Sequence, residues 1–413
     1  MEKITYLKSD EISDLILPLS ARGMDLNLER MKLAIRLLGK PCNGIPAIQI
    51  AGTNGKGSIT SFLESFFIKE GLKVGITTSP HLLSWCERIK IDGKKIAERE
   101  FKERLIKIKS ITREINLTPF ELVIATALDH FSFHKVKLMV LEVGLGGRFD
   151  ATTAHQHRPL IGMASIGLDH CEHLGIDLRE IAKEKAAIIE SESIVVSAMQ
   201  SKEVMEIFEE TVAKKKARLR WVKPISKEWD LGIPGEIQRK NAAVAKGILE
   251  ELSTLGLKIK EENIRESFGL AKWPGRLQRV TWKGMPLVLD SAHNPAAAAE
   301  LSKERLSWFN QEEGIHWIVG IQRNKDASSI LRHLMKPKDS LWIVPITDHN
   351  YWTKENLVDV CPEIARKAIE VERVEEILEE LLSAEEWPQP APVITGSIYL
   401  LGNLLSKNIF KDD

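Results

Sequence analysis

The chain has few cysteines, no excess of charge and no long apolar run. Its four cysteines are scattered over 413 residues without a C-x-x-C pair, which excludes a disulfide framework and is typical of a reducing compartment. Lys+Arg and Asp+Glu are both 58, so no overall field attracts nucleic acid or an anionic membrane. No run approaches the roughly 18 apolar residues of a membrane span, and the opening residues lack a signal core. We therefore expect a cytoplasmic protein without nucleic-acid or membrane partners.

The length and the order of apolar segments predict two α/β domains. One core rarely holds 413 residues. Short apolar runs alternate with helical patterns, first at 46–50, 73–78, 138–142, 159–166 and 193–198, and again at 287–290, 316–321, 341–346 and 392–395. Such alternation is typical of mostly parallel, doubly wound sheets. We predict one domain over 1–278 and a smaller one over 279–413, with a hinge at 273–276.

Amphipathic spacing predicts the helices around these strands. The segment 25–38 keeps its apolar residues on one stripe and stops at Gly39, and 59–70 has the same spacing. The segment 120–133 is apolar nearly all round, which indicates a buried helix. Residues 199–240 carry fewer signals, and their basic run at 214–216 is typical of a solvated helix face.

The segment AGTNGKGS at 51–58 is the strongest functional signal in the chain. It is a glycine-rich turn between an apolar strand and a helix, where free backbone N–H groups bind phosphate. Lys56 would reach the outer phosphates, and the Ser58 hydroxyl would face a metal ion. The common P-loop has glycine in place of Ile50 and Ser or Thr in place of Gly57. An ordinary surface turn is the alternative.

Further polar residues follow other strands of the first domain. Ligands of an open parallel sheet bind at the carboxyl ends of its strands. Ser79, Glu142 and the pair Asp169-His170 all fall there. The glycine-rich stretch 144–147 would let a ligand approach Glu142, whose carboxylate suits Mg²⁺. The alternatives are a structural ion pair for Glu142 and a hydrogen-bonded core histidine for His170.

Lys185 lies on the apolar side of another predicted helix. Asp177 and Glu180 resemble a capping box that opens this helix. A lysine that points inward normally snorkels or pairs with an acid such as Glu184 or Glu142. A desolvated lysine can instead lose its proton and add CO₂, and the resulting carbamate is a metal ligand. The spacing leaves both interpretations open.

Together these motifs resemble the folylpolyglutamate synthase/dihydrofolate synthase family of the Mur-ligase superfamily. The resemblance covers nearly the whole chain. Its blocks are GTNGKGS at 52–58, TSPH at 78–81, ERI at 87–89, FE at 120–121, LEVGLGGR at 141–148, SIGLDH at 165–170, EKA at 184–186, WPGR at 273–276, DSAHNP at 290–295 and TGS at 395–397. Their shared order makes the resemblance more specific than any single block.

The resemblance implies an ATP-dependent glutamate ligase, with a P-loop domain and a Rossmann-like second domain that closes over ATP and glutamate. The implied ATP contacts are Thr53, Asn54, Gly55, Lys56, Gly57, Ser58, Asn241, Arg276, Asp290 and His293. The implied ligands of two Mg²⁺ ions are Ser58, Ser79, Glu142, His170 and Lys185, the last as a carbamate. Lys56, His170 and Lys185 are the implied catalytic residues, and a monovalent cation is a further expectation.

The resemblance also implies a pterin site and hence a role in folate biosynthesis. Its implied residues are Met24, Asp25, Thr118, Pro119, Phe120, Glu121, Phe149, Asp150 and Ala151. They favour a bifunctional enzyme that adds L-glutamate to dihydropteroate and to the γ-carboxylate of reduced folates, and the family resemblance also suggests a monomer. Monofunctional dihydrofolate synthase and monofunctional folylpolyglutamate synthase are the alternatives. The chain departs from the family pattern at Thr153, Ala187, Glu190 and Ile237, none of them a proposed ligand.

Amide formation from a carboxylate needs activation, which the family pattern supplies through an acyl phosphate. Lys56, the loop N–H groups and Mg²⁺ would neutralise charge as the phosphoryl group moves. Three other classes fit less well. A cell-wall amino-acid ligase would need more than the 51 residues that precede Gly52 here. A P-loop kinase would need no closing second domain, and a scaffold without catalysis would need none of these polar residues.

Overall fold

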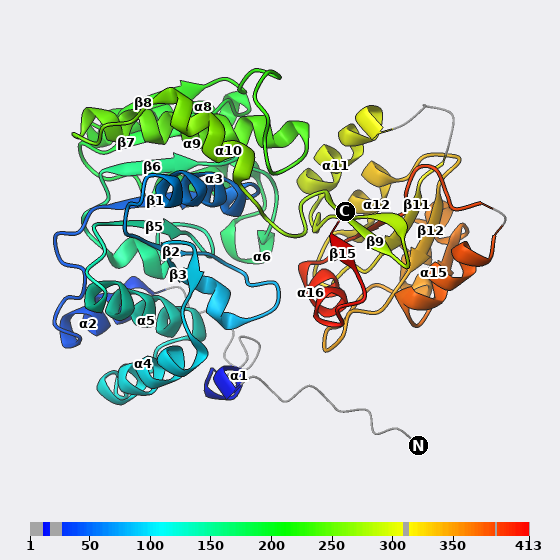
Figure 1. The fold of residues 1–413 in the computed structure, drawn as a ribbon, viewed down its shortest axis with the longest axis horizontal. Helices are drawn as coiled ribbons and strands as arrows, with labels where there is room; N and C mark the ends of the chain where they lie inside the picture. Colours follow the sequence, from blue (N-terminus) through cyan, green and yellow to red (C-terminus); the bar gives the residue numbers. More distant parts are fainter. Residues whose placement is uncertain (1–10, 17–26, 309–313, 385, 413) are drawn as a thin grey trace. The chain divides into compact units, whose positions relative to one another are not determined.

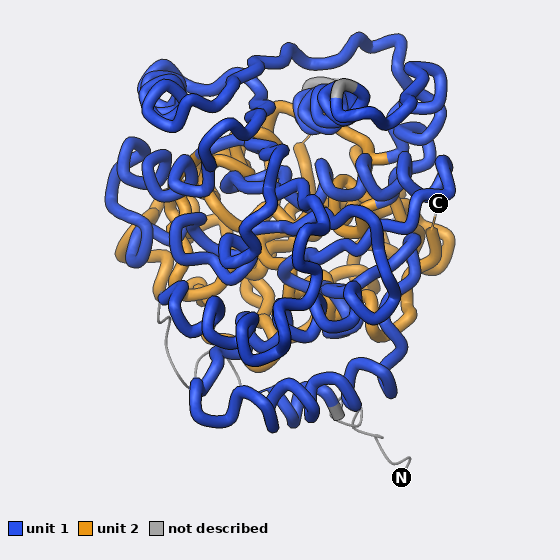
Figure 2. Tube along the Cα trace, turned by 90° about the vertical axis from the view of Figure 1, so that its left-hand side faces the viewer, with its two compact units in different colours: residues 1–166, 170–232, 239–272 blue, residues 167–169, 233–238, 273–413 orange. Residues whose placement is uncertain are grey.

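The computed structural model describes residues 11–16, 27–308, 314–384 and 386–412, which form two compact units (Figures 1 and 2). Unit 1 comprises the residues up to 166 together with 170–232 and 239–272, and unit 2 comprises 167–169, 233–238 and the chain from 273 onward. Three stretches of the predicted first domain, 167–169, 233–238 and 273–278, therefore belong to unit 2. Met24 and Asp25 lie outside the described residues.

Unit 1 contains an eight-stranded sheet. Its strands are β1 (Ala47–Ala51), β2 (Val74–Thr77), β3 (Ile89–Ile91), β4 (Lys94–Lys95), β5 (Leu138–Glu142), β6 (Leu160–Met163), β7 (Ile194–Ala198) and β8 (Arg218–Val222). They are ordered β4-β3-β2-β5-β1-β6-β7-β8. The six strands from β2 to β8 along this order are parallel, and β3 and β4 extend the sheet in antiparallel fashion.

The helices of unit 1 cover this sheet. They are α1 (Glu11–Leu15), α2 (Leu28–Leu37), α3 (Lys56–Lys69), α4 (Glu98–Ile111), α5 (Pro119–Phe133), α6 (Cys171–Leu174), α7 (Leu178–Ala186), α8 (Lys202–Lys215), α9 (Glu236–Thr254, whose first residues are counted with unit 2) and α10 (Glu261–Leu270). Helices α3 and α10 lie side by side (Figure 1), and the ring centres of Phe62 and Phe268 are 4.9 Å apart between them.

The helix ends follow the capping residues of the sequence. Helix α2 begins after Asn27, whose side chain accepts the N–H of Glu29 at 2.8 Å. Helix α5 begins after Thr118, which forms a capping box with Glu121 and is followed by a proline in the first turn. Eleven of the 15 residues of α5 are buried, in line with its apolar sequence. The cap of α7 differs from the predicted capping box in one respect. In a capping box Glu180 would accept the N–H of the N-cap residue Asp177, but it accepts the N–H of Ile176 instead.

Unit 2 contains a seven-stranded sheet. Its strands are β9 (Gln278–Trp282), β10 (Met285–Leu289), β11 (His316–Val319), β12 (Ser340–Ile343), β13 (Ala368–Glu370), β14 (Val393–Thr395) and β15 (Lys411–Asp412), in the order β13-β12-β11-β14-β10-β9-β15. The pairs made by β9 are antiparallel and the others are parallel. Its helices are α11 (Pro295–Trp308), α12 (Ala327–Leu334), α13 (Lys354–Val358), α14 (Pro362–Ala365), α15 (Val374–Ser383) and α16 (Ile398–Ser406).

Both sheets are mostly parallel and flanked by helices, so the predicted α/β class is confirmed. The apolar core of unit 2 packs around Trp317, which is fully buried. Among the described helices of both units, none combines the length and the apolar character that crossing a membrane demands.

Candidate active site

Four neighbouring parallel strands of unit 1 end at one edge of the sheet. In the order β2-β5-β1-β6, Ile50 is opposite Glu142, and Ala51 is opposite Met163. The glycine-rich loop follows β1, Ser79 follows β2, and Glu142 is the last residue of β5. The Ser79 N–H donates to Glu142 Oε2 at 3.2 Å. The structure thus brings the loop, Ser79 and Glu142 together, as expected from their positions at strand ends.

The loop requires glycine at two positions. Gly52 has φ +141°, and a Cβ atom there would lie 2.6 Å from Ala164 Cβ. Gly55 has φ +100°, and a Cβ atom there would overlap the side-chain amide of Asn241. Asn241 therefore lies directly against the loop. Both glycines have a positive φ that other residues rarely adopt, and both lie against another residue, Ala164 or Asn241. Any larger residue at either position would therefore displace the loop.

Ser165 supports the loop from the end of β6. Its carbonyl oxygen accepts the N–H groups of Thr53 at 2.8 Å and Asn54 at 3.3 Å, and its hydroxyl donates to the Asn54 carbonyl at 3.0 Å. The sequence showed Ser165 only as part of a motif. Its supporting role became visible when β1 and β6 were found side by side.

Two lysines meet at one carbonyl oxygen of the loop. Lys56 Nζ, at the start of α3, donates to Gly52 O at 3.2 Å and to Thr53 O at 3.1 Å. Lys185 Nζ reaches the same Gly52 oxygen from α7 at 3.0 Å, and Lys185 is only 4% exposed. Two amino groups in a mostly buried place repel each other when both are charged, and a polyanion between them relieves that repulsion. The arrangement suits a chain of phosphates.

The N-terminus of α3 is left open beside these lysines. Its N-cap is Gly55, and within the described residues no side chain caps the helix there. The first four N–H groups of a helix have no partner inside the helix, and its dipole attracts negative charge. An uncapped helix start next to two amino groups is a phosphate-binding arrangement.

Two buried hydroxyl groups lie near the same edge. In the described part of the chain, neither Ser58 Oγ in the first turn of α3 nor Thr77 Oγ1 at the end of β2 has a hydrogen-bond partner. A buried polar atom without a partner usually marks a place for a ligand, ion or water. Ser58 therefore fits the predicted metal site. Thr77 was not predicted, although its position at a strand end beside Ser79 was a usable signal.

The remaining predicted ligand on unit 1 is His170, the N-cap of α6. Its backbone lies in the left-handed region, with φ 51° and ψ 40°, which costs about 1 kcal/mol for a residue other than glycine. Its Nδ1 lies 3.9 Å from Glu172 Oε1. Strained backbone of this kind concentrates at functional sites, so the geometry suits the predicted role.

Glu184 is not the ion-pair partner of Lys185. It binds Arg148 instead, with 2.9 Å between Arg148 Nε and Glu184 Oε1. Glu190, which departs from the family pattern, forms an ion pair with the buried side chain of Arg158. A carboxylate at position 190 is explained by this arginine.

The segments predicted to hold a pterin lie next to each other. Phe120 packs on Gly144 so closely that a Cβ atom on the glycine would lie 2.6 Å from the ring. Asp150 Oδ2 accepts the N–H groups of Gly144 at 2.8 Å and Leu145 at 3.1 Å. Burial raises the pKa of Asp150 in spite of these hydrogen bonds. Asp150 also accepts hydrogen bonds from the backbone N–H and the hydroxyl of Thr152, so its side chain shapes the 144–152 segment.

The other residues of this region differ in exposure. Glu121 is buried and accepts the Thr118 N–H at 2.8 Å and Arg30 Nε at 3.2 Å. Pro119 and Ala151 are also buried, whereas Phe149 is 43% exposed. Of these side chains, only Phe149 offers a large apolar surface to a ligand without rearrangement.

The predicted nucleotide contacts of unit 2 gather around the end of β10. Asp290 accepts the N–H groups of Leu277 at 3.0 Å and Ala292 at 2.9 Å, and Arg276 Nη1 donates to Ser291 Oγ at 2.7 Å. Burial raises the pKa of Asp290, although Arg276 opposes this shift. The buried carboxylate holds the turn from which Arg276 projects.

His293 and Asp169 belong to the same cluster. Asp169 is counted with unit 2, where it pairs with Lys325 Nζ at 2.6 Å and accepts Asn294 Nδ2 at 2.9 Å. His293 Nε2 lies 3.8 Å from Asp169, and burial, together with Lys325, lowers the pKa of His293 to about 4. From the sequence we placed both Asp169 and His170 in the first domain. In the structure Asp169 is counted with unit 2 and His170 with unit 1.

A glycine-rich loop with an uncapped helix start at the carboxyl edge of a parallel sheet, followed by a second α/β unit, is typical of a nucleotide-binding α/β enzyme. The family model described as "Dihydrofolate synthetase, C-terminal domain" matches residues 275–407. The Escherichia coli (strain K12) dihydrofolate synthase/folylpolyglutamate synthase is 32% identical over 357 residues, which cover 83% of this chain and 82% of that protein. The chain belongs to the dihydrofolate synthase/folylpolyglutamate synthase family.

Solved structures agree with this assignment. E. coli FolC in complex with DHPP and ADP has a TM-score of 0.84 and 26% identity, with 99% of each chain covered. The bifunctional folylpolyglutamate synthase/dihydrofolate synthase from Yersinia pestis, complexed with AMPPNP and Mn ion, also has a TM-score of 0.84 and 26% identity, with 99% of each chain covered. The predicted family and fold are confirmed.

Proposed function

We propose that this chain is an ATP-dependent ligase that joins L-glutamate to dihydropteroate and to the γ-carboxylate of reduced folates. The observation that carries the proposal is the Lys56 amino group at the Gly52 carbonyl, beside the uncapped start of α3. The names of the bifunctional relatives and the ligands of their structures support the substrates and the nucleotide.

The reaction begins with attack of the substrate carboxylate on the γ-phosphate. An acyl phosphate forms and ADP leaves; the amine of glutamate then attacks the acyl carbon and expels phosphate. Lys56 and the N–H groups at the start of α3 hold the phosphates and neutralise the charge that moves with the phosphoryl group. Gly52 and Gly55 let the backbone approach closely enough to do so.

A divalent ion completes the proposed site. Ser58, Ser79, Glu142 and His170 would hold it, and it would supply charge neutralisation to the phosphates. The buried hydroxyl of Ser58 and the carboxylate of Glu142 are oxygen ligands of the kind that Mg²⁺ prefers. The Mn-containing complex of the Y. pestis relative supports a divalent ion. A monovalent cation is also part of the proposal, on the family resemblance.

Lys185 is proposed to carry a carbamate. Its nitrogen is buried and lies 3.0 Å from Gly52 O, a contact that a carbamate preserves because its nitrogen keeps one hydrogen. The carbamate oxygens would replace a buried positive charge with a metal ligand. A high-resolution electron-density map from protein prepared with bicarbonate tests this, and a bare amino group in that map contradicts it.

The division of labour between the two parts of the chain is also a proposal. Residues 1–278 would bind the nucleotide and the folate, and 279–413 would close over ATP and glutamate. Arg276, Asp290 and His293 are the proposed contributions from the unit 2 cluster, supported by their common place at the end of β10. The enzyme is proposed to act as a cytoplasmic monomer.

The deciding experiment supplies the purified protein with ATP, Mg²⁺ and glutamate, and with dihydropteroate or tetrahydrofolate separately. Glutamate-dependent ADP release with both acceptors is the expected result. Release with neither acceptor contradicts the folate assignment. A matched reaction without glutamate measures uncoupled ATP hydrolysis and is subtracted.

A monofunctional dihydrofolate synthase is the second candidate. The observation that favours it is the match of residues 275–407 to the family model described as dihydrofolate synthetase. In the same assay this candidate predicts ADP release with dihydropteroate alone. Release with tetrahydrofolate alone would identify a monofunctional folylpolyglutamate synthase.

A further inference from the structure

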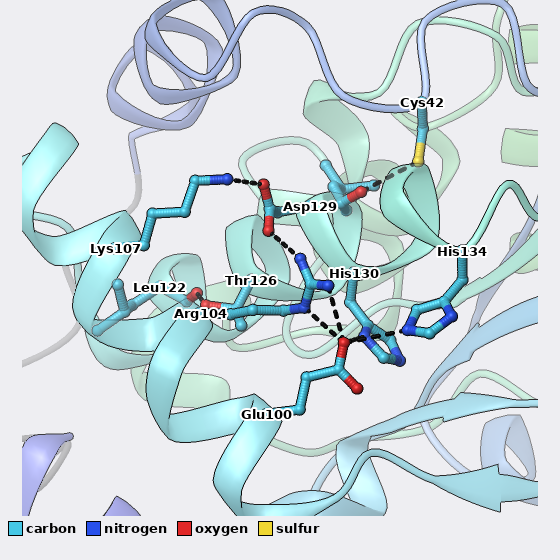
Figure 3. Close-up of polar contacts among 10 residues, drawn as sticks. Cys42, Glu100, Arg104, Lys107, Leu122, Thr126, Asp129, His130 and His134 are labelled. Carbon is cyan, nitrogen blue, oxygen red and sulfur yellow. Dashed lines mark hydrogen bonds and ion pairs between the residues drawn. The ribbon is translucent and has the colours of Figure 1, made fainter.

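Two histidines and a glutamate meet where α4 packs on α5. Glu100 lies in the first turn of α4, His130 lies in the last turn of α5, and His134 is the residue directly after α5 (Figure 3). His130 and His134 are four residues apart, so a helical turn brings them to the same face. Their ring centres are 4.4 Å apart. None of these residues takes part in the proposed ligase site.

The nitrogen and oxygen atoms have the spacing of metal ligands. Glu100 Oε1 lies 3.1 Å from His130 Nδ1 and 3.0 Å from His134 Nε2, and one ligand atom from each residue falls within 4.8 Å of the others. Ligands about 2.0–2.1 Å from a tetrahedral zinc ion are about 3.3 Å from one another. A small outward movement of three side chains therefore makes room for the ion.

The surroundings suit a bound cation. His130 is buried, with 4% of its surface exposed, and Glu100 Oε1 lies within hydrogen-bonding distance of both imidazole rings. The cluster also lies at the C-terminus of α5, where the helix dipole favours positive charge.

Arg104 is the native competitor for Glu100. Its Nε and Nη2 donate to Glu100 Oε1 at 2.9 and 2.8 Å, and its Nη1 donates to Asp129 Oδ2 at 2.6 Å. Asp129 also pairs with Lys107. Because Asp129 holds the guanidinium independently, Arg104 keeps a partner when Glu100 turns to a metal ion. Figure 3 shows the second oxygen of Glu100 pointing away from these contacts.

We propose that Glu100, His130 and His134 form a binding site for a divalent transition-metal ion of the zinc class, with solvent in the fourth position. Imidazole and carboxylate ligands suit zinc, cobalt and nickel, whereas magnesium prefers oxygen alone. The ion joins the start of α4 to the end of α5 and so stabilises unit 1. Phe120 lies fourteen residues before His134 along α5, about 21 Å away, so the site is separate from the substrate segments.

Zinc titration by calorimetry tests the proposal on the full chain without nucleotide, in excess Mg²⁺ to occupy the oxygen-rich site. We expect one zinc ion per chain and a rise in the melting temperature. His134→Ala and Glu100→Gln should each weaken zinc binding roughly tenfold or more. Both positions are partly exposed, at 34% and 30% of the side chain, so these variants are expected to fold.

Two controls make the test specific. His157→Ala replaces an exposed histidine of unit 1 outside the cluster and should leave zinc binding unchanged. His170→Ala should also leave it unchanged, and loss of zinc binding in that variant places the ion at the ligase site and overturns the proposal. Equal binding by the wild type, His134→Ala and Glu100→Gln, or no saturable binding at all, also overturns it. Visible absorption of Co²⁺ typical of tetrahedral coordination, lost in His134→Ala, supports it.

Discussion

The helices α3 and α11 begin in opposite ways, although each follows a parallel strand and a short loop. Helix α3 starts at Gly55, and no described side chain caps it. Helix α11 starts with Pro295, which has no N–H, and Asn294 Oδ1 accepts the N–H of Ala297 at 2.8 Å. The N-terminal donors are therefore left open in unit 1 and used internally in unit 2.

The loops before the two helices also differ in how far the protein itself satisfies their backbone N–H groups. The loop after β1 carries glycines and leads to Lys56. Its Thr53 and Asn54 N–H groups donate to the Ser165 carbonyl, and no described side chain caps the helix that follows. The loop after β10 contains a buried carboxylate, Asp290, which accepts the N–H groups of Leu277 and Ala292. A strand, a loop and a helix thus make a phosphate site only when the helix donors are not already satisfied by the protein itself.

The largest effect is expected for Lys56→Ala. This change removes the cation of the open loop, and we expect ADP release to fall roughly 10²–10³-fold, because preorganised donors to a reacting phosphoryl group contribute at that scale. Lys69→Ala is the matched control, since Lys69 ends the same helix and pairs with Glu266. Near-normal turnover of Lys56→Ala would contradict the assigned role of the loop.

The loop after β10 should be the more acid-sensitive of the two. Burial lowers the pKa of His293 to about 4, below its usual value of 6.5. Stability from the neutral ring is present above pH 6.5 and is lost as the pH falls towards 4, by about 3 kcal/mol in total. Hydrogen exchange measured as protection factors should show weakening at 290–296 before 52–58. His293→Asn should flatten this pH dependence, and an unchanged profile argues against His293 as the cause.

Gly55→Ala should weaken nucleotide binding about tenfold. The added methyl group would overlap Asn241 in a backbone with φ +100°, so the loop must shift. Gly284→Ala is the matched control, because Gly284 has φ +84° in unit 2 with no atom within 4 Å of the added methyl group. Both variants carry backbone strain of about 1 kcal/mol, but only Gly55→Ala should lose affinity in calorimetry. Equal affinities would show that the loop tolerates the displacement.

The smallest effect is expected for Asn294→Ala. Removing the cap of α11 should cost unit 2 about 1 kcal/mol of unfolding free energy, measured in urea. Asn27→Ala, which removes the Asn cap of α2 in unit 1, is the comparison variant with the same type of hydrogen bond. No loss in Asn294→Ala would mean that the start of α11 does not depend on its side-chain cap.

The central strands and the ligand-bearing edge were predictable from the sequence. Strands β1, β5, β6 and β7 are buried on both faces, so they are continuous apolar runs, and their ends show where polar residues gather. Strand β8 was missed because it lies at the edge of the sheet. Its sequence RLRWV alternates two arginines with apolar residues and is mostly only half-buried, and Arg220 pairs with Glu250 and Glu251 instead of packing in the core.

Three features required the tertiary structure. The contact of Gly55 with Asn241 joins residues 186 positions apart, and no local pattern signals it. Ser165 supports the loop only because β6 lies beside β1. Asp169 and His170 are adjacent in sequence but belong to different units. The site residues that were predicted from strand ends thus acquired their supporting partners from distant segments.

The sequence by itself determined the α/β class, the family and the position of the glycine-rich loop between a strand and a helix, because periodicity and glycine placement are local properties of the chain. The tertiary structure decided which donors stay open at the two helix starts, which lysines share a carbonyl, and where Glu100 meets His130 and His134. These depend on distances between segments far apart in sequence, which packing sets and local composition does not encode.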